Sequence, residues 1–166
     1  MKKNILLIIL LTLAFDLYSE ALTSYQGVML FSPLPAVTKQ FDIMEKSKDS
    51  SLDIPGQVTY VAKNYNNPQE WTLFFEKVPS RDPVLISLSV KNHKASYEDY
   101  LTLVNANIKH NSIPNNINEP DILPWYSANW ITELEGYSGF VTVFSITYTP
   151  DIQLLVVSLR FSDRRF

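Results

Sequence analysis

One amphipathic helix, placed between two groups of strands, most constrains the fold that this chain can adopt. Ser96 and Asp99 have the spacing of a helix capping box, which marks a helix N-terminus. Apolar side chains then recur at helical period until Asn111 and Pro114 end the pattern. Because the opposite face is polar, we predict a helix that lies on a sheet with one side in solvent. The predicted apolar stripe consists of Tyr97, Tyr100, Leu101, Val104 and Ile108.

Three segments before this helix read as strands. Residues 57–63 are rich in β-branched and aromatic side chains, and a turn-rich stretch follows them. Residues 71–76 and 84–91 alternate between apolar and polar side chains, which is typical of strands with one buried face. Prolines and polar residues in 79–83 separate these two strands. We therefore predict a hairpin ahead of the helix.

Three more strands follow the helix at the spacing of a meander. They span about 127–135, 140–148 and 153–161, with turns at 136–139 and 149–151. The order is thus a hairpin, a helix and a three-stranded meander. The sequence predicts an α+β fold in which one amphipathic helix lies across a face of an antiparallel sheet.

The N-terminal segment, residues 1–21, has the pattern of a secretory signal peptide. A basic head of residues 1–4 precedes an apolar run of residues 5–15, and Ser19 and Ala21 put small residues before a cleavage point. The run is shorter than the roughly 20 residues that span a bilayer. We expect cleavage near Ala21 and a periplasmic or secreted protein; an uncleaved segment that tethers the chain to the membrane is the alternative. Residues 22–56 read as a loosely attached lead-in, and residues 57–166 as the α+β domain.

Composition narrows the chemistry of the chain. It has 166 residues, no cysteine and a net charge of −3. Without cysteine there is no thiolate metal site, disulfide or thiol-based redox centre. Scattered basic residues in a mildly acidic chain lack the footprint of a nucleic-acid-binding protein. We expect an unidentified protein or small molecule as the partner, no nucleic acid, and membrane association only through an uncleaved signal segment.

No catalytic or metal-binding motif stands out. His93 and His110 have no further ligands at metal-site spacing, and we expect both in solvent. Ser138 lies between glycines in a predicted hairpin turn, without a histidine partner. Glu133 and Glu135 share a strand face, where acidic residues are commonly solvated. We expect no catalytic residues, no metal and no cofactor.

The order of elements resembles the Mog1/PsbP-like group. The resemblance covers about residues 57–163 and consists of core and cap positions rather than catalytic ones. It implies a central antiparallel sheet between helical layers and, loosely, a binding or accessory role. The segments that carry it are Trp71-Thr72-Leu73, Ile86 to Val90, Ala95 to Leu101, and Leu154 to Phe161.

The connection from Pro120 to Tyr126 is the candidate binding loop. It is apolar and aromatic, and two prolines bracket it, which lowers the entropy cost of holding its side chains in place. Large rigid aromatic residues in loops are frequent in binding sites. The alternative is that these side chains only close the end of the core. The candidate binding residues are Ile122, Leu123, Trp125 and Tyr126.

These observations lead to one expectation about function and two alternatives. We expect an exported, soluble binding or accessory module without enzymatic activity. A small secreted hydrolase with an unrecognised site is the first alternative. A small envelope-associated β-protein is the second.

Overall fold

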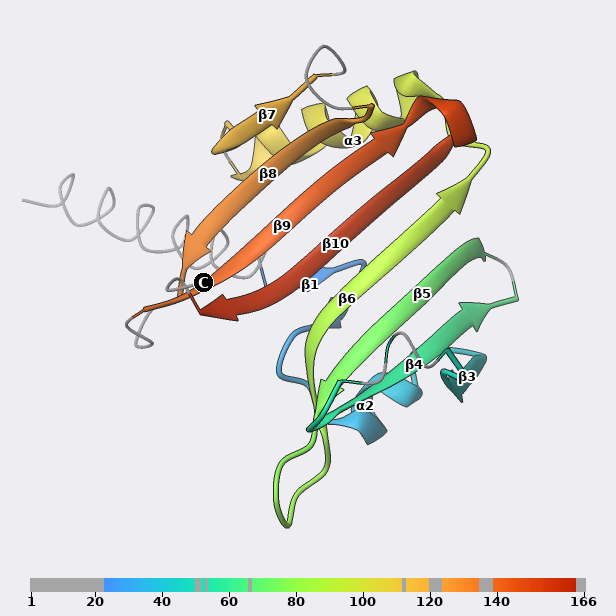
Figure 1. Cartoon of the computed structure of the whole chain (residues 1–166), viewed down its shortest axis with the longest axis vertical. Coiled ribbons are helices and arrows are strands. Elements are labelled where there is room, and N and C mark those ends of the chain that lie inside the picture. Colours follow the sequence, from blue (N-terminus) through green and yellow to red (C-terminus); the bar gives the residue numbers. More distant parts are fainter. Residues whose placement is uncertain are drawn as a thin grey trace, which may run out of the picture.

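An eight-stranded antiparallel sheet dominates the fold (Figure 1). The computed structural model describes residues 23–49, 52, 54–65, 67–111, 113–119, 124–134 and 139–163. The prediction of an α+β fold with an antiparallel sheet is confirmed. In spatial order the strands are β3 (Ile43–Lys46), β4 (Gln57–Asn64), β5 (Asn67–Glu76), β6 (Val84–His93), β10 (Leu154–Asp163), β9 (Phe140–Thr149), β8 (Tyr126–Glu133) and β7 (Asn116–Asn118).

Helix α3 (Tyr97–Asn111) carries the chain from the middle of the sheet to its edge. The chain leaves the central strand β6, passes through α3, and re-enters the sheet at the edge strand β7. It then returns through β8, β9 and β10, and β10 pairs with β6. A short 3₁₀ helix, Pro150–Ile152, joins β9 to β10. Both edge strands, β3 and β7, are short, which limits the unpaired backbone that the sheet exposes.

The hydrogen-bonded register builds continuous apolar rows on one face of the sheet. The side chains in these rows come from alternate positions of each strand, so one face is covered and the other is not. Most of them are buried, and burial of apolar area is the main stabilising term of the fold. One row across six strands consists of Trp130, Phe144, Leu159, Leu88, Leu73 and Tyr60.

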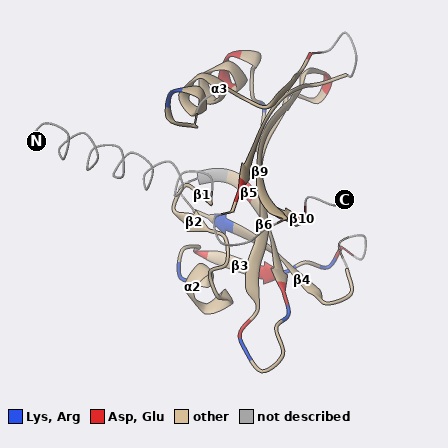
Figure 2. Cartoon of the chain, turned by 90° about the vertical axis from the view of Figure 1, so that its left-hand side faces the viewer, with Lys and Arg blue, Asp and Glu red and all other residues tan. Residues whose placement is uncertain are grey.

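Helix α3, the hairpin of β1 (Ser24–Tyr25) and β2 (Val28–Met29), and the short helix α2 (Leu34–Thr38) all lie on this covered face (Figure 2). Val28, Leu30 and Val37 belong to the main core. Backbone hydrogen bonds also tie the segment to β6, since Phe31 N–H donates to the Leu85 carbonyl at 2.7 Å. The expectation of a loosely attached lead-in over residues 22–56 is therefore corrected. The sequence did not predict this packing because the segment is largely polar and contributes only a few apolar side chains to the core.

The helix itself is where the capping box placed it, but its buried face is rotated from the prediction. Ser96 N–H donates to Asp99 Oδ2 at 2.7 Å, and Asp99 N–H donates to Ser96 Oγ at 3.2 Å. Tyr100 and Val104 are buried as expected, whereas Tyr97 is 41% and Leu101 37% exposed. Ile108 is half-buried against the core as predicted, and so is Leu103, which the predicted stripe leaves out. Two asparagines are on the same side of the helix, Asn107 half-buried and Asn111 buried.

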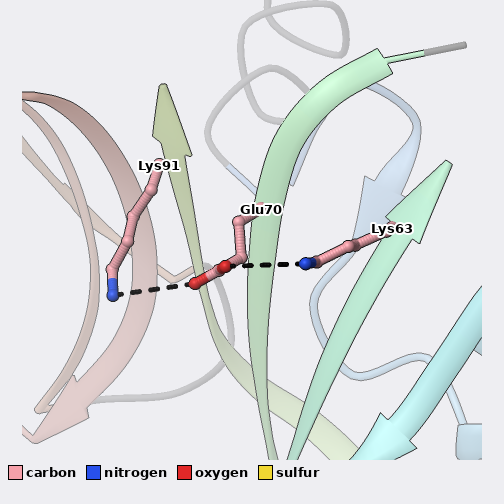
Figure 3. Close-up of polar contacts among 3 residues, drawn as sticks. All are labelled: Lys63, Glu70 and Lys91. Atoms are coloured by element: carbon pink, nitrogen blue, oxygen red, sulfur yellow. Dashed lines mark ion pairs between the residues drawn. The ribbon is translucent and has the colours of Figure 1, made fainter. Parts of the chain in front are cut away.

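The opposite face of the sheet carries small hydroxyl and charged side chains. Glu70 on β5 lies between Lys63 and Lys91, with oxygen–nitrogen distances of 3.9 and 4.0 Å (Figure 3). These partly exposed ion pairs contribute little to stability. The central row on this face consists of Asn129, Ser145, Ser158, Ser89 and Thr72. No helix in the described part of the chain is long and apolar enough to cross a bilayer.

Candidate functional site

A groove separates helix α3 from the β1–β2 hairpin on the covered face of the sheet. It consists of two adjoining hollows of about 220 and 260 Å³. Four residues line both hollows, so they are two parts of one groove: Tyr25 and Gln26 of the hairpin, Leu103 of α3 and Val157 of β10.

The floor of the groove is apolar. In the first hollow it is formed by Val90 of β6 and Leu155 of β10, and in the second by Phe144 and Ile146 of β9. All four side chains are buried core residues. A ligand in the groove would therefore rest on the core of the domain, as small molecules do in most binding sites.

Tyr25 stands where the two hollows meet. Its ring lies 5.9 Å from that of Trp71 and 6.0 Å from that of Phe144, measured between centroids. Burial raises the pKa of the Tyr25 phenol above its usual value, while a hydrogen bond from Gln26 acts in the opposite direction. In that bond Gln26 Nε2 donates to the Tyr25 hydroxyl oxygen at 3.2 Å. Tyr25 thus adds one hydroxyl group to the lining of both hollows.

The turn that presents these two side chains is strained at one residue. Gln26 and Gly27 have φ values of 49° and 82°, as a two-residue hairpin turn of type I′ requires. Glycine adopts this conformation freely, but a glutamine does so at a cost of order 1 kcal/mol. Strained residues of this kind often occur at functional sites.

Two asparagines one helical turn apart form the most unusual part of the wall. Asn111 Nδ2 donates to Asn107 Oδ1 at 2.6 Å. Asn107 Nδ2 and Asn111 Oδ1 are buried and have no hydrogen-bond partner among the described residues. An unpaired buried polar atom costs about 1–3 kcal/mol. Native proteins contain few such atoms, so a pair of them beside a groove needs an explanation.

The remaining polar lining of the groove is mostly uncharged. Gln69 and Asn92 add two more carboxamides at the end near β5 and β6. Asp99 also lines this end, but its carboxylate accepts the capping hydrogen bonds of Ser96, and these lower the pKa of Asp99. His110 lines the other end and is exposed. The exposure predicted for His93 and His110 is confirmed.

The opposite flank of α3 is filled by aromatic rings. Between ring centroids, Tyr97 lies 4.5 Å from Tyr126, and Tyr100 lies 5.9 Å from Tyr126 and 6.4 Å from Tyr148. Burial, followed by the nearby Tyr97, Glu119 and Tyr126, raises the pKa of Tyr100 to about 12. We call this set the tyrosine cluster: Tyr97, Tyr100, Tyr126 and Tyr148.

The candidate binding loop ends at this tyrosine cluster rather than at the groove. Tyr126 is half-buried and belongs to the cluster, and Trp125 is also half-buried. Asn118 Nδ2 donates to the Trp125 carbonyl at 2.8 Å, which holds the loop end to β7. Ile122 and Leu123 lie outside the described residues. The role predicted for these four residues stays a prediction.

A larger hollow, of about 610 Å³, lies on the uncovered face of the sheet. It is lined by side chains that include Ile131, Val143 and Arg160, and two of its asparagines already have partners. Asn115 Oδ1 accepts from Ile131 N–H, and Asn129 Oδ1 accepts from the Ser145 hydroxyl. The groove beside α3 is the stronger candidate because its buried polar atoms are unpaired. The described residues contain no group of His, Asp and Glu suited to a metal ion.

Sequence reasoning missed the groove. Its hairpin wall comes from residues 22–56, where the sequence predicts only a loosely attached lead-in. The signal that was available is the position of Asn107 and Asn111, three and seven residues after Val104, on the side of the helix that faces the sheet. Comparisons of the chain with protein-family models, with curated proteins and with solved structures find no match.

Proposed function

We propose that the protein is an exported, soluble, non-catalytic binding or accessory module, and that its ligand site is the groove between α3 and the β1–β2 hairpin. The observation that carries this proposal is the combination of an apolar floor with unpaired buried carboxamides in one concave site. Among the residues that the structure describes, the lining carries no arrangement of nucleophile, base and orienting acid, and Asp99 already serves the helix cap.

Export rests on the signal-like pattern of residues 1–21, a segment that lies outside the described residues. We expect the mature chain to begin near Leu22, so that Ser24 and Tyr25 stay in the mature protein as the hairpin wall of the groove. Intact-mass measurement on protein recovered from the cell envelope tests this expectation. A mass that retains residues 1–21, together with membrane association, would contradict it.

The ligand site is tested with N-phenyl-1-naphthylamine, an uncharged apolar dye whose fluorescence rises on burial. We expect saturable binding of one dye molecule per chain. Ala106 lines the groove on the exposed surface of α3, so Ala106→Phe fills it and should weaken binding by about tenfold or more. Asn105→Phe, at the exposed neighbouring position, is the matched control and should leave binding unchanged. Absence of dye binding, or equal binding by both variants, would overturn the proposal.

A second candidate function is protein recognition at the tyrosine cluster and the adjoining loop. Tyr97 is 41% exposed, and aromatic side chains of this kind are frequent binding hot spots. Trp125→Ala distinguishes the two roles of the loop. If the loop only closes the core, the variant protein should be less stable than the wild-type chain. If the loop binds a partner, the variant should bind that partner more weakly and keep the wild-type melting point.

The resemblance to the Mog1/PsbP-like group supports the same kind of role. It implies a binding or accessory protein rather than an enzyme, and it rests on core and cap positions such as Trp71 and Ser96. We include in this proposal the predicted arrangement, in which a hairpin, a helix and a three-stranded meander share one sheet.

A further inference from the structure

We infer that the groove takes an uncharged ligand in which a carboxamide edge is joined to an apolar body of about ring size. This inference rests on the proposed function, because it names the ligand class of the same groove. It is carried by the pair of asparagines in the wall, by the floor beneath them and by the charges around them.

The asparagine pair has one NH₂ group and one carbonyl oxygen without a hydrogen bond among the described residues. Asn111 is only 5% exposed, and its Oδ1 has no partner among the described residues. Asn107 Nδ2 is likewise buried and unpaired. Turning both amides over would exchange the roles of the two residues but leave the same balance, one NH₂ group and one carbonyl oxygen without a partner. The demand for a donor and an acceptor therefore does not depend on how the amides are assigned.

A carboxamide meets both demands at once. Its oxygen accepts from the free N–H of Asn107, and its own N–H donates to the free oxygen of Asn111. A carboxylate has only acceptors and would leave the Asn111 oxygen unpaired, and an ammonium group has only donors and would leave the Asn107 N–H unpaired. Selectivity of this kind is strong because the unsatisfied partner is buried.

The surroundings favour an uncharged, partly apolar ligand. Phe144, Ile146 and Val157 form the floor of the hollow that Asn107 and Asn111 line, and this hollow has a volume of about 260 Å³. Among the described residues, His110 is the only titratable side chain there besides Tyr25, and it is exposed. No lysine, arginine or carboxylate lines this hollow in the described part of the chain, so charge does not select an anion or a cation.

The inference is tested with benzamide, compared at pH 7 with benzoate, which has the same shape but lacks the N–H donor. The readout is the NMR spectrum of the side-chain NH₂ groups in the ¹⁵N-labelled mature chain. Asn107 and Asn111 should shift with benzamide, because the buried amides must turn to meet the probe. We expect benzoate to bind about tenfold more weakly.

Variants separate recognition from folding. Asn107→Leu/Asn111→Leu removes both carboxamides of the pair, so benzamide should lose its advantage over benzoate. Asn105→Leu, on the exposed face of the same helix, is the control and should keep the full preference for benzamide. If this double variant fails to fold, the shifts of the two NH₂ signals in the wild-type chain decide whether the asparagines bind the probe.

The outcomes distinguish the two proposals. Dye binding with equal affinity for benzamide and benzoate, or with unmoved Asn107 and Asn111 signals, would overturn the inference and leave the binding function standing. Absence of binding by the dye and by both probes would overturn the proposed function itself.

Discussion

The two flanks of helix α3 differ in how they meet the rest of the domain. On one flank Tyr97 and Tyr100 pack against tyrosines of β8 and β9, and the rings fill the space between helix and sheet. On the other flank the helix meets the hairpin across a groove, and Asn107 and Asn111 keep two polar atoms unpaired beside it. The first flank gains stability from packing, whereas the second gives up stability at two unpaired atoms beside the groove that we propose as the ligand site. The contrast makes opposite predictions for similar substitutions on the same helix.

The largest effect is expected on the tyrosine flank. Tyr100 is only 4% exposed, so Tyr100→Ala should lower the free energy of unfolding by about 3–5 kcal/mol, the range for large buried aromatic side chains. Leu101→Ala is the control on the next residue. Leu101 is 37% exposed, so its loss should cost less than about 1 kcal/mol rather than the cost of a buried leucine. Denaturant melts measure the free energy of unfolding of both variants. A loss for Leu101→Ala as large as that for Tyr100→Ala would contradict the observed orientation of the helix, in which Leu101 is partly exposed.

The groove flank should respond in the opposite direction. Replacing both asparagines in Asn107→Leu/Asn111→Leu removes two unpaired polar atoms and their shared hydrogen bond. We expect the free energy of unfolding to rise by about 1–2 kcal/mol, because apolar replacement of both partners spares the cost of the unsatisfied groups. The same double variant should lose its preference for benzamide. A loss of stability by several kcal/mol would mean that the pair is structural.

The helix cap lies at the N-terminus of α3, where its Asp99 also lines one end of the groove. Ser96→Ala removes the hydroxyl that accepts from Asp99 N–H, and this should cost about 0.5–2 kcal/mol. Dye binding by the folded variant should be unchanged. The cap also depends on pH: the pKa of Asp99 is lowered in the folded chain, so its contribution is present near neutral pH and is lost in acid. As the pH is lowered, Ser96→Ala should lose less of its free energy of unfolding than the wild-type chain does.

The sequence predicts those features of the fold that depend on residues close together in the chain. Alternation identified the long strands, and the Ser96–Asp99 spacing identified the helix N-terminus. The short strands β3 and β7 escaped notice because they have too few residues for a pattern and are held by pairing with β4 and β8. The groove escaped for a related reason, since its walls come from segments that lie far apart in the chain, such as those of Tyr25 and Asn107.

The smallest expected effect is the alkaline behaviour of the tyrosine flank. Burial raises the pKa of Tyr100 from its ordinary value of 10 to about 12. The stability that comes from the neutral phenol is therefore fully present below pH 10 and is lost as the pH rises through 12. Tyr100→Phe cannot ionise, so its melting point should fall less steeply over this interval. Equal slopes for the two proteins would show that Tyr100 does not drive the alkaline loss.

The position of a bound probe decides most directly whether the groove is the ligand site. Methyl-labelled mature chain is mixed with N-phenyl-1-naphthylamine, and contacts are measured as nuclear Overhauser effects between dye and protein. We expect contacts to Leu103, Ile146 and Val157, whose side chains line the groove. Contacts to Ile131 and Val143 would instead place the dye in the hollow on the uncovered face of the sheet and contradict the assignment.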